Sequence, residues 1–383
     1  MSNAPPPSTG IFARWGPTAV VFCMFCVYSA VQSPVPGVNE PQYLGKAKHL
    51  WDSSWAAGDF FLDTSNPHLV FYLAVGWLTR FLTLETTAWV ARLAGYAVVA
   101  AGWTMFAGRL SRSRWAAIPA AAIFLLLASV GNLSGEWLVG GIEGKVFAYG
   151  LLIAAIALWL DGRATASAAC LGGAVSFHPV VGVWGVLCGA AAEAVGWWRG
   201  DRPAITRHRG WIVPAIVLVV TALPGLVPAV LSLDGSSPDD AARATYMQVF
   251  IRLRHHLDPT QFSPARYVGY GLLLAGWLTL WIGNRRRDDE SDATGGRTDR
   301  WFLVFVLTSV AIAIAGVAIG WHNGSAWTMP LRDLRGTLLK FYPFRLADVF
   351  VPLAFSMAMA AFLTGPASEP RPSGSAFRRT HVE

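Results

Sequence analysis

The first acidic residues with a spacing suited to chemistry lie in a polar segment that follows the first apolar run. It opens with Asn39, Glu40 and Tyr43 and continues to a Gly-Asp-Phe turn at Asp59 and on to Asp63. Two separated carboxylates on one loop can divide the work of a general base and of a group that orients it or holds a metal. We therefore predict Glu40 and Asp59 as catalytic residues, with Asn39 and Tyr43 binding substrate. The alternative is that the acids cap short helices, Asp59 and Asp63 above all.

A second polar segment, residues 135–149, holds Glu136, Glu143 and Lys145 around a pair of glycines. Paired glycines favour a tight or re-entrant loop. We predict Glu143 as a catalytic acid and Glu136 and Lys145 as substrate contacts, facing Glu40 across a cavity. A simple ion pair between Glu143 and Lys145 is the alternative.

His178 and Arg345 each stand at the end of an apolar run. His178 precedes Pro179, which breaks a helix, and an ionisable residue at membrane depth is a functional candidate by default. Arg345, preceded by proline and aromatic residues, can receive a lipid phosphate. The alternatives are a hydrogen bond from His178 to a backbone carbonyl, and snorkelling of Arg345 or its pairing with Asp348.

The densest polar cluster contains Arg252, Arg254, His255 and His256. If this segment is helical, Arg252 and His256 share a face that can hold a phosphate. We predict all four as substrate-binding residues. Metal binding by the histidines with Asp258, or a plain polar surface, are the alternatives.

Composition assigns these residues to a membrane protein. The 383 residues are 54% hydrophobic and 14% charged, with a mean hydropathy of +0.43, whereas a soluble domain has roughly 25% charged residues. Repeated apolar runs of near-spanning length predict an all-α polytopic membrane protein. The net charge of +7 has no accompanying basic and aromatic pattern, which argues against nucleic acid. All four cysteines lie in apolar runs, so we predict neither a redox pair nor a metal site there.

The positive-inside rule selects one threading of about ten spans. The predicted spans are 17–33, 86–108, 114–131, 146–161, 163–178, 180–198, 211–231, 266–283, 301–320 and 346–363. The run 67–84 is also apolar, but counting it as a span would place three arginine-rich loops outside. As a juxtamembrane helix on the outer surface, it leaves those loops and both termini in the cytoplasm.

The threading makes residues 1–363 a single transmembrane domain and residues 364–383 a disordered cytoplasmic tail. The outer loops are then 34–85, 131–145, 232–265 and 321–345. These loops are rich in Lys and Arg, which predicts an anionic ligand on that side. Pairing with local acids is the alternative.

The order of features over residues 11–200 resembles the GT-C-type integral-membrane glycosyltransferases. One helix precedes a loop that opens with Glu40-Pro-x-Tyr43, a Gly-Asp-Phe turn and a Pro-led amphipathic helix follow, and a span then opens with Glu85-x6-Arg92. Aminoarabinose and mannosyl transferases that use polyprenyl-phosphate sugars are similar in pattern. In that family an Asp-Glu pair in the first outer loop binds a metal or positions the acceptor. Here the pair is Asn39-Glu40, so the first acid is missing.

The resemblance implies transfer of a sugar from a polyprenyl-phosphate donor to a glycan, lipid or protein acceptor outside a bacterial plasma membrane. Arg252, Arg254 and Arg345 would hold the phosphate, and Glu40 would be the base or would position the acceptor. An acid in the second outer loop matches Glu136 or Glu143. No ligand set of standard spacing indicates a metal, and a divalent cation stays open. The alternatives are a transporter or flippase for an anionic lipid-linked substrate, or a catalytically inactive scaffold with this fold.

Overall fold

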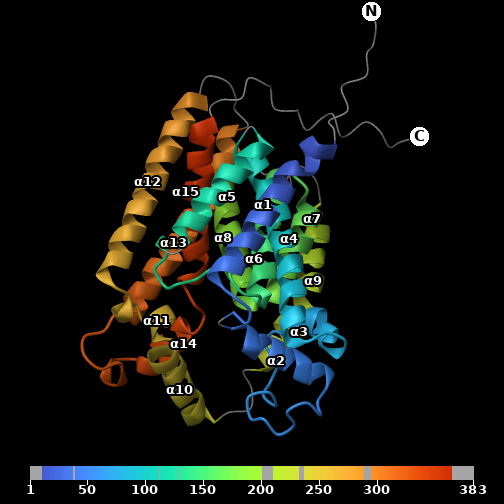
Figure 1. The fold of residues 1–383 in the computed structure, drawn as a ribbon. Helices are drawn as coiled ribbons and strands as arrows, with labels where there is room; N and C mark the ends of the chain where they lie inside the picture. Colours follow the sequence, from blue (N-terminus) through green and yellow to red (C-terminus); the bar gives the residue numbers. More distant parts are fainter. Residues whose placement is uncertain are drawn as a thin grey trace, which may run out of the picture.

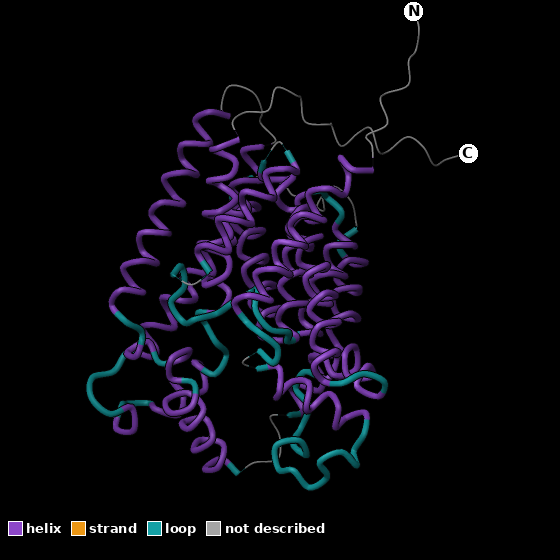
Figure 2. Tube along the Cα trace, viewed as in Figure 1, coloured by secondary structure: helices purple, strands orange, loops and turns teal. Residues whose placement is uncertain are grey.

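The computed structural model describes residues 11–37, 39–111, 113–128, 130–200, 210–232, 237–288 and 295–364. Within these residues every regular element is a helix and none is a strand (Figure 2). The predicted tail lies outside the described part, except for Thr364. The all-α class is therefore confirmed.

In the described part of the chain, ten helices form a bundle, and the chain passes up and down through it (Figure 1). They are α1 (Ile11–Gln32), α4 (Leu84–Leu110), α5 (Ala117–Leu127), α6 (Gly144–Leu160), α7 (Ala164–Phe177), α8 (Pro179–Trp198), α9 (Ile212–Leu231), α12 (Pro264–Asp288), α13 (Gly295–Gly320) and α15 (Arg345–Thr364). The start of α1 and the end of α15 lie at the same end of the bundle.

Short helices gather at the opposite end, which we call the loop end (Figure 1). They are α2 (Glu40–Trp51), α3 (Leu69–Gly76) with the 3-10 turn Trp77–Arg80, α10 (Pro238–Tyr246) with the π-helix Met247–Arg252, α11 (Arg254–Leu257) and α14 (Arg332–Leu339). The segment predicted to lie along the surface, 67–84, is thus a short helix and a single 3-10 turn. It is shorter than the ~20 residues that a span needs.

Six helices of the described residues are long and apolar enough to cross a membrane, and they make this a polytopic α-helical membrane protein. They are Trp15–Gln32, Leu84–Leu110, Pro179–Trp198, Ile212–Leu231, Asp299–Gly320 and Arg345–Thr364. The outward side chains of α9, such as Ile216, Val220 and Leu223, are exposed. So much exposed apolar surface fits lipid as the surrounding medium.

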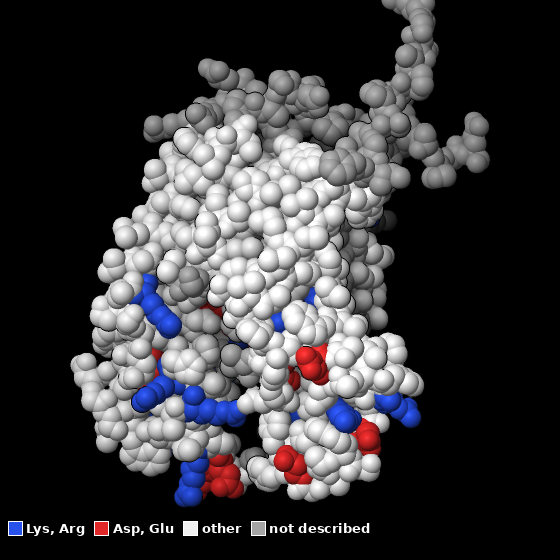
Figure 3. Space-filling view, viewed as in Figure 1, with Lys and Arg blue, Asp and Glu red and all other residues white. Residues whose placement is uncertain are grey.

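Charged side chains gather at the loop end in Figure 3, whereas the bundle shows an uncharged belt on that face. The same view shows a recess between the side that carries α10 and α14 and the side that carries α2 and α3. Backbone groups at membrane depth are satisfied inside helices, so polar loops collect where water reaches them.

Small residues let bundle helices pack backbone to backbone. A Cβ added to Gly225 of α9 would lie 2.0 Å from the carbonyl oxygen of Ser176 in α7. A Cβ added to Gly102 of α4 would lie 2.5 Å from the carbonyl oxygen of Gly150 in α6. Because lipid tails remove the hydrophobic drive for association, such close contacts are a main source of helix–helix affinity in membranes.

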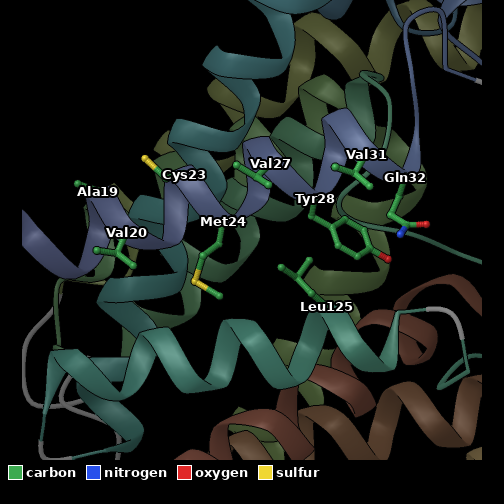
Figure 4. A pocket seen from close by; sticks show the side chains of 9 residues that line it. All are labelled: Ala19, Val20, Cys23, Met24, Val27, Tyr28, Val31, Gln32 and Leu125. Carbon is green, nitrogen blue, oxygen red and sulfur yellow. The ribbon is translucent and has the colours of Figure 1, made fainter.

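An apolar groove of about 680 Å³ runs along the side of the bundle between α1 and α5 (Figure 4). Eight residues of α1, among them Cys23, Tyr28 and Gln32, line it together with Leu125 of α5. All four cysteines are free thiols. The groove belongs to the lipid-facing surface and carries no charged group.

Candidate functional site

Glu40 is the first residue of α2 and is 1% exposed. Arg92 of α4 donates two hydrogen bonds to it, from Nε to Oε1 at 2.6 Å and from Nη2 to Oε2 at 2.8 Å. The backbone N–H groups of Gly37 and Ile142 donate to the same carboxylate at 2.5 and 2.8 Å. Both carboxylate oxygens are therefore engaged twice, which makes Glu40 a buried counter-ion for Arg92.

The Arg92 side chain also ties the start of the loop to α1. Its Nη1 donates to the carbonyl oxygen of Ser33 at 2.6 Å and to Oγ of Ser29 at 3.1 Å. Tyr96, one turn further along α4, donates to Ser29 at 2.9 Å. The Glu40–Arg92 pair thus joins α1, α2, α4 and the loop before α6. An arginine inside an apolar span was the signal in the sequence, because such a residue needs a partner.

A second set of polar contacts begins at Asn39, the neighbour of Glu40 in the sequence. Asn39 Nδ2 donates to Glu143 Oε1 at 2.6 Å. Lys145 Nζ lies 3.8 Å from Glu143 Oε1 and 3.3 Å from Glu136 Oε1. Arg345 Nε donates to Glu136 Oε2 at 3.1 Å. Two carboxylates and two cations therefore alternate, and Glu136, Glu143 and Lys145 are all buried.

Histidine and tyrosine side chains complete the set. Arg345 Nη1 lies 2.9 Å from His178 Nε2, and the His178 ring is 4.9 Å from the ring of His68. His68 Nε2 hydrogen-bonds the hydroxyl of Tyr43 at 3.3 Å. Because the Tyr43 N–H donates to the Asn39 carbonyl at 3.1 Å, the chain of contacts returns to its start. We call these eight residues the polar ring: Asn39, Tyr43, His68, Glu136, Glu143, Lys145, His178 and Arg345.

His178 owes its position to Pro179, which starts α8 and makes His178 its N-cap. Its Nδ1 accepts from the Val181 N–H at 3.3 Å, while Arg345 Nη1 approaches Nε2. In a neutral imidazole only one of the two ring nitrogens can accept a hydrogen bond. The Val181 N–H and Arg345 Nη1 therefore cannot both donate to His178. Arg345 therefore lacks a second full acceptor inside the ring.

Asp348 anchors the loop that carries Glu136. Its carboxylate accepts from the N–H of Leu133 at 2.8 Å, and from the N–H and Oγ of Ser134 at 2.8 and 2.7 Å. The pair between Arg345 and Asp348 that the sequence left open is not formed. Asp348 instead accepts hydrogen bonds from the loop that carries Glu136, and Arg345 contacts Glu136.

Two polar atoms of the ring are buried without a hydrogen bond: His68 Nδ1, and Glu136 Oε1, which faces Lys145 Nζ at 3.3 Å as an ion pair. Burial first, and then the charge of Arg345, lowers the pKa of His68 to about 4. Burial, and then the charge of Glu143, raises the pKa of Tyr43. At neutral pH His68 and Tyr43 are therefore both uncharged. Lys145 and Arg345 are then the basic groups of the ring, and the hydrogen-bonding capacity of His68 Nδ1 is unmet.

Several predicted residues lie outside the ring. Asp59 is exposed and accepts from the N–H groups of Phe61 and Leu62, both at 3.0 Å, so it caps its own turn. Asp63 contacts His49 at 2.9 Å. The contacts of Asp59 match the capping alternative, whereas Asp63 pairs with His49 and caps no helix.

The predicted phosphate face of the Arg/His cluster is not assembled. Arg252 ends the π-helix and His256 lies in the separate helix α11, so the two do not share one helical face. Arg252, Arg254 and His255 are exposed, whereas His256 Nδ1 contacts the Ser134 carbonyl. Within the described residues, no group of three or more His, Cys, Asp and Glu could hold a metal.

The structure brings together seven of the predicted residues and adds His68, which the sequence analysis missed. His68 follows Pro67 just before α3 and resembles His178 in standing at a helix start, which was the available signal. No protein-family model, curated protein or solved structure matches the chain. The interpretation of the polar ring therefore rests on its geometry.

Proposed function

We propose that the polar ring is the substrate site of a GT-C-type membrane glycosyltransferase, which moves a sugar from a polyprenyl-phosphate donor to an acceptor at the outer face of the membrane. The observation that supports this most is the alternation of Lys145 and Arg345 with Glu136 and Glu143 at the loop end. This reaction needs cations that bind the lipid phosphate and a carboxylate that accepts the proton of the acceptor hydroxyl.

Arg345 is the phosphate ligand in this proposal. Its guanidinium has five donors, and its Nη1 competes with Val181 for the acceptor of His178. A phosphate oxygen is a stronger acceptor for arginine than a neutral imidazole, because the bond is charge-assisted. Lys145, which also lies 3.8 Å above the ring of Trp137, adds the second positive charge. Arg252 and Arg254 are exposed at the same end and attract the anionic headgroup over longer distances.

Glu143 is the general base in place of Glu40. Glu40 has four hydrogen bonds and a buried partner, so accepting a proton would break the pair with Arg92. Glu143 contacts Asn39 at 2.6 Å and has Lys145 only at 3.8 Å. It takes the proton of the acceptor hydroxyl as that oxygen attacks C1 of the sugar. The C1–O bond to phosphate breaks, and the polyprenyl phosphate leaves with the electron pair towards Arg345 and Lys145.

The proposal includes a topology of ten spans with both termini in the cytoplasm of a bacterial cell. It is supported by the common end of α1 and α15, and by the four bundle helices beyond the six long apolar ones (Figure 1). The loop end then faces outward. Apolar helices α5, α6 and α7 are shorter than six turns and would cross with help from the neighbouring polar loops.

The experiment that tests the function uses the purified full chain in lipid vesicles with radiolabelled polyprenyl-phosphate sugars and a panel of acceptor lipids. Transfer is expected with the wild type, and Glu143→Gln should lower it by about 10²-fold or more, the range for loss of a general base. Asp59→Asn is the matched control, because Asp59 is an exposed acid outside the ring. Equal transfer by Glu143→Gln and Asp59→Asn would overturn the assignment of the base.

A binding measurement, combined with the transfer assay, distinguishes the enzyme from a flippase and from an inactive scaffold. Polyprenyl phosphate should raise the thermal stability of the wild type and not of Arg345→Gln, since a ligand of the native state stabilises it. Binding without transfer, together with movement of the lipid between leaflets, would favour a flippase. Binding without either activity would favour an inactive scaffold, for which Asn39 at the place of an acid is the relevant feature.

A further inference from the structure

Helix α14 has an exposed apolar stripe. Leu334 and Leu338 are exposed and lie one turn apart on one face of the helix, and Leu331 directly before the helix and Phe341 just beyond its end are exposed as well. On the side that faces the protein, Leu339 is fully buried. The helix therefore shows apolar side chains both to the protein and to its surroundings.

The depth of α14 relative to the bundle is fixed by its contacts with the end of α13. Arg335 Nε donates to the carbonyl oxygen of Ile319 at 2.5 Å, and its Nη2 donates to the carbonyl oxygen of Trp321. A Cβ added to Gly320 would lie 3.3 Å from Leu339 Cδ1. Since α13 is one of the long apolar helices and ends at Gly320, α14 lies at the level where the apolar span ends (Figure 1).

The span on whose end α14 packs has exposed apolar side chains of its own. Leu307 and Ile314 of α13 are exposed within the span, and Trp321 is exposed directly after it. Trp327 is exposed as well, in the turn before α14. Tryptophans at the end of a span mark the interface between hydrocarbon and headgroups. The surroundings of α14 are therefore those of the interface.

A polar face of the same helix lies beside the stripe. Asp333 and Thr337 are exposed and one turn apart. Arg332 Nε donates to Asp333 at 2.7 Å, and its guanidinium lies 4.1 Å above the ring of Trp327. An amphipathic helix with one polar and one apolar exposed side lies in the plane of a membrane interface.

We propose that α14 is an interfacial helix that docks on the bilayer leaflet at the loop end. Leu334, Leu338 and Phe341 enter the upper acyl region, while Asp333 and Thr337 stay in water. The occupant of the stripe is the lipid itself, because α14 packs on the end of the apolar span α13 and exposed tryptophans lie at the same level. The inference does not depend on the proposed function.

The test compares two neighbouring positions on α14 in the full chain, reconstituted in vesicles of phosphatidylcholine and phosphatidylglycerol. Leu338→Cys and Thr337→Cys carry a spin label, in a background with the four native cysteines replaced by alanine. The label at 338 should be severalfold more accessible to oxygen than to a water-soluble nickel chelate, and the label at 337 should show the reverse. Equal nickel accessibility at both positions would overturn the proposal.

A second outcome addresses a protein partner or a second copy on the stripe. A label at 338 that is shielded from both oxygen and nickel would show contact with protein and would also overturn the proposal. The unmodified chain offers an independent measurement if the cysteine-free background does not fold. A phospholipid with a diazirine near the start of its acyl chain should label the peptide that contains residues 331–341. Labelling of α13 peptides without this one would count against docking.

Discussion

Arg92 and Glu40 form a buried pair with two parallel hydrogen bonds, of 2.6 and 2.8 Å, and each side chain is 1% exposed. The pair connects the first residue of α2 to α4. Since removal of one partner leaves the other charge buried alone, we expect Arg92→Leu to lower the free energy of unfolding by about 3–5 kcal/mol. Unfolding by heat or denaturant in detergent measures it.

The double variant Glu40→Gln/Arg92→Met is the control for that prediction. It removes both charges, so it should recover part of the stability lost in Arg92→Leu. A single variant as stable as the wild type would show that the pair contributes nothing.

The contact between Asn39 and Glu143 predicts the effect of restoring the missing acid. Asn39→Asp replaces a donor at 2.6 Å by a second carboxylate. Repulsion raises the pKa of one of the two acids, so the folded state takes up a proton more readily than the unfolded chain. The variant should therefore lose stability as the pH rises above about 4, the ordinary value for the two acids. Asn39→Ser, which adds no charge, should lack this pH dependence.

His68 predicts acid sensitivity. Its pKa is lowered from 6.5 to about 4 in the folded chain by burial and by Arg345. Between these values the unfolded state binds more protons, so stability falls as the pH drops from 6.5 towards 4. At about 1.4 kcal/mol per pKa unit, the loss through this residue is ~3 kcal/mol. Measured between pH 7 and 4.5, His68→Gln should show a flatter stability curve than the wild type; parallel curves would contradict the assignment.

The glycines predict two opposite effects of one substitution. Gly225→Ala would place a methyl group 2.0 Å from the Ser176 carbonyl oxygen, so we expect a loss of roughly 1–3 kcal/mol. Gly271 lies in α12 with nothing within 4 Å of an added Cβ. Gly271→Ala should therefore leave stability unchanged or raise it by up to about 1 kcal/mol. Thermal unfolding of both variants checks the contrast, and equal effects would speak against backbone contact between α7 and α9.

The sequence by itself determined that the protein lies in a membrane and that its secondary structure is helical. Apolar runs and scarce charge require membrane helices, because a backbone in lipid must satisfy its own hydrogen bonds. The break at Pro179 and the polar segments around Glu40 and Glu143 also follow from residue types alone. Local chemistry of this sort acts through neighbours in the chain, so a single sequence is enough to recognise it.

Only the tertiary structure decided which charges meet. Glu40 and Asn39 are adjacent, yet Glu40 pairs with Arg92 and Asn39 reaches Glu143. Arg345 pairs with Glu136 and not with Asp348, because the Asp348 carboxylate accepts hydrogen bonds from Ser134. The partners are separated by 52 to 214 positions in the chain, and their pairing depends on how α4, α6 and α15 pack. Charge pairs form between whichever buried groups the packing brings within a few ångströms, and no spacing along the chain encodes that.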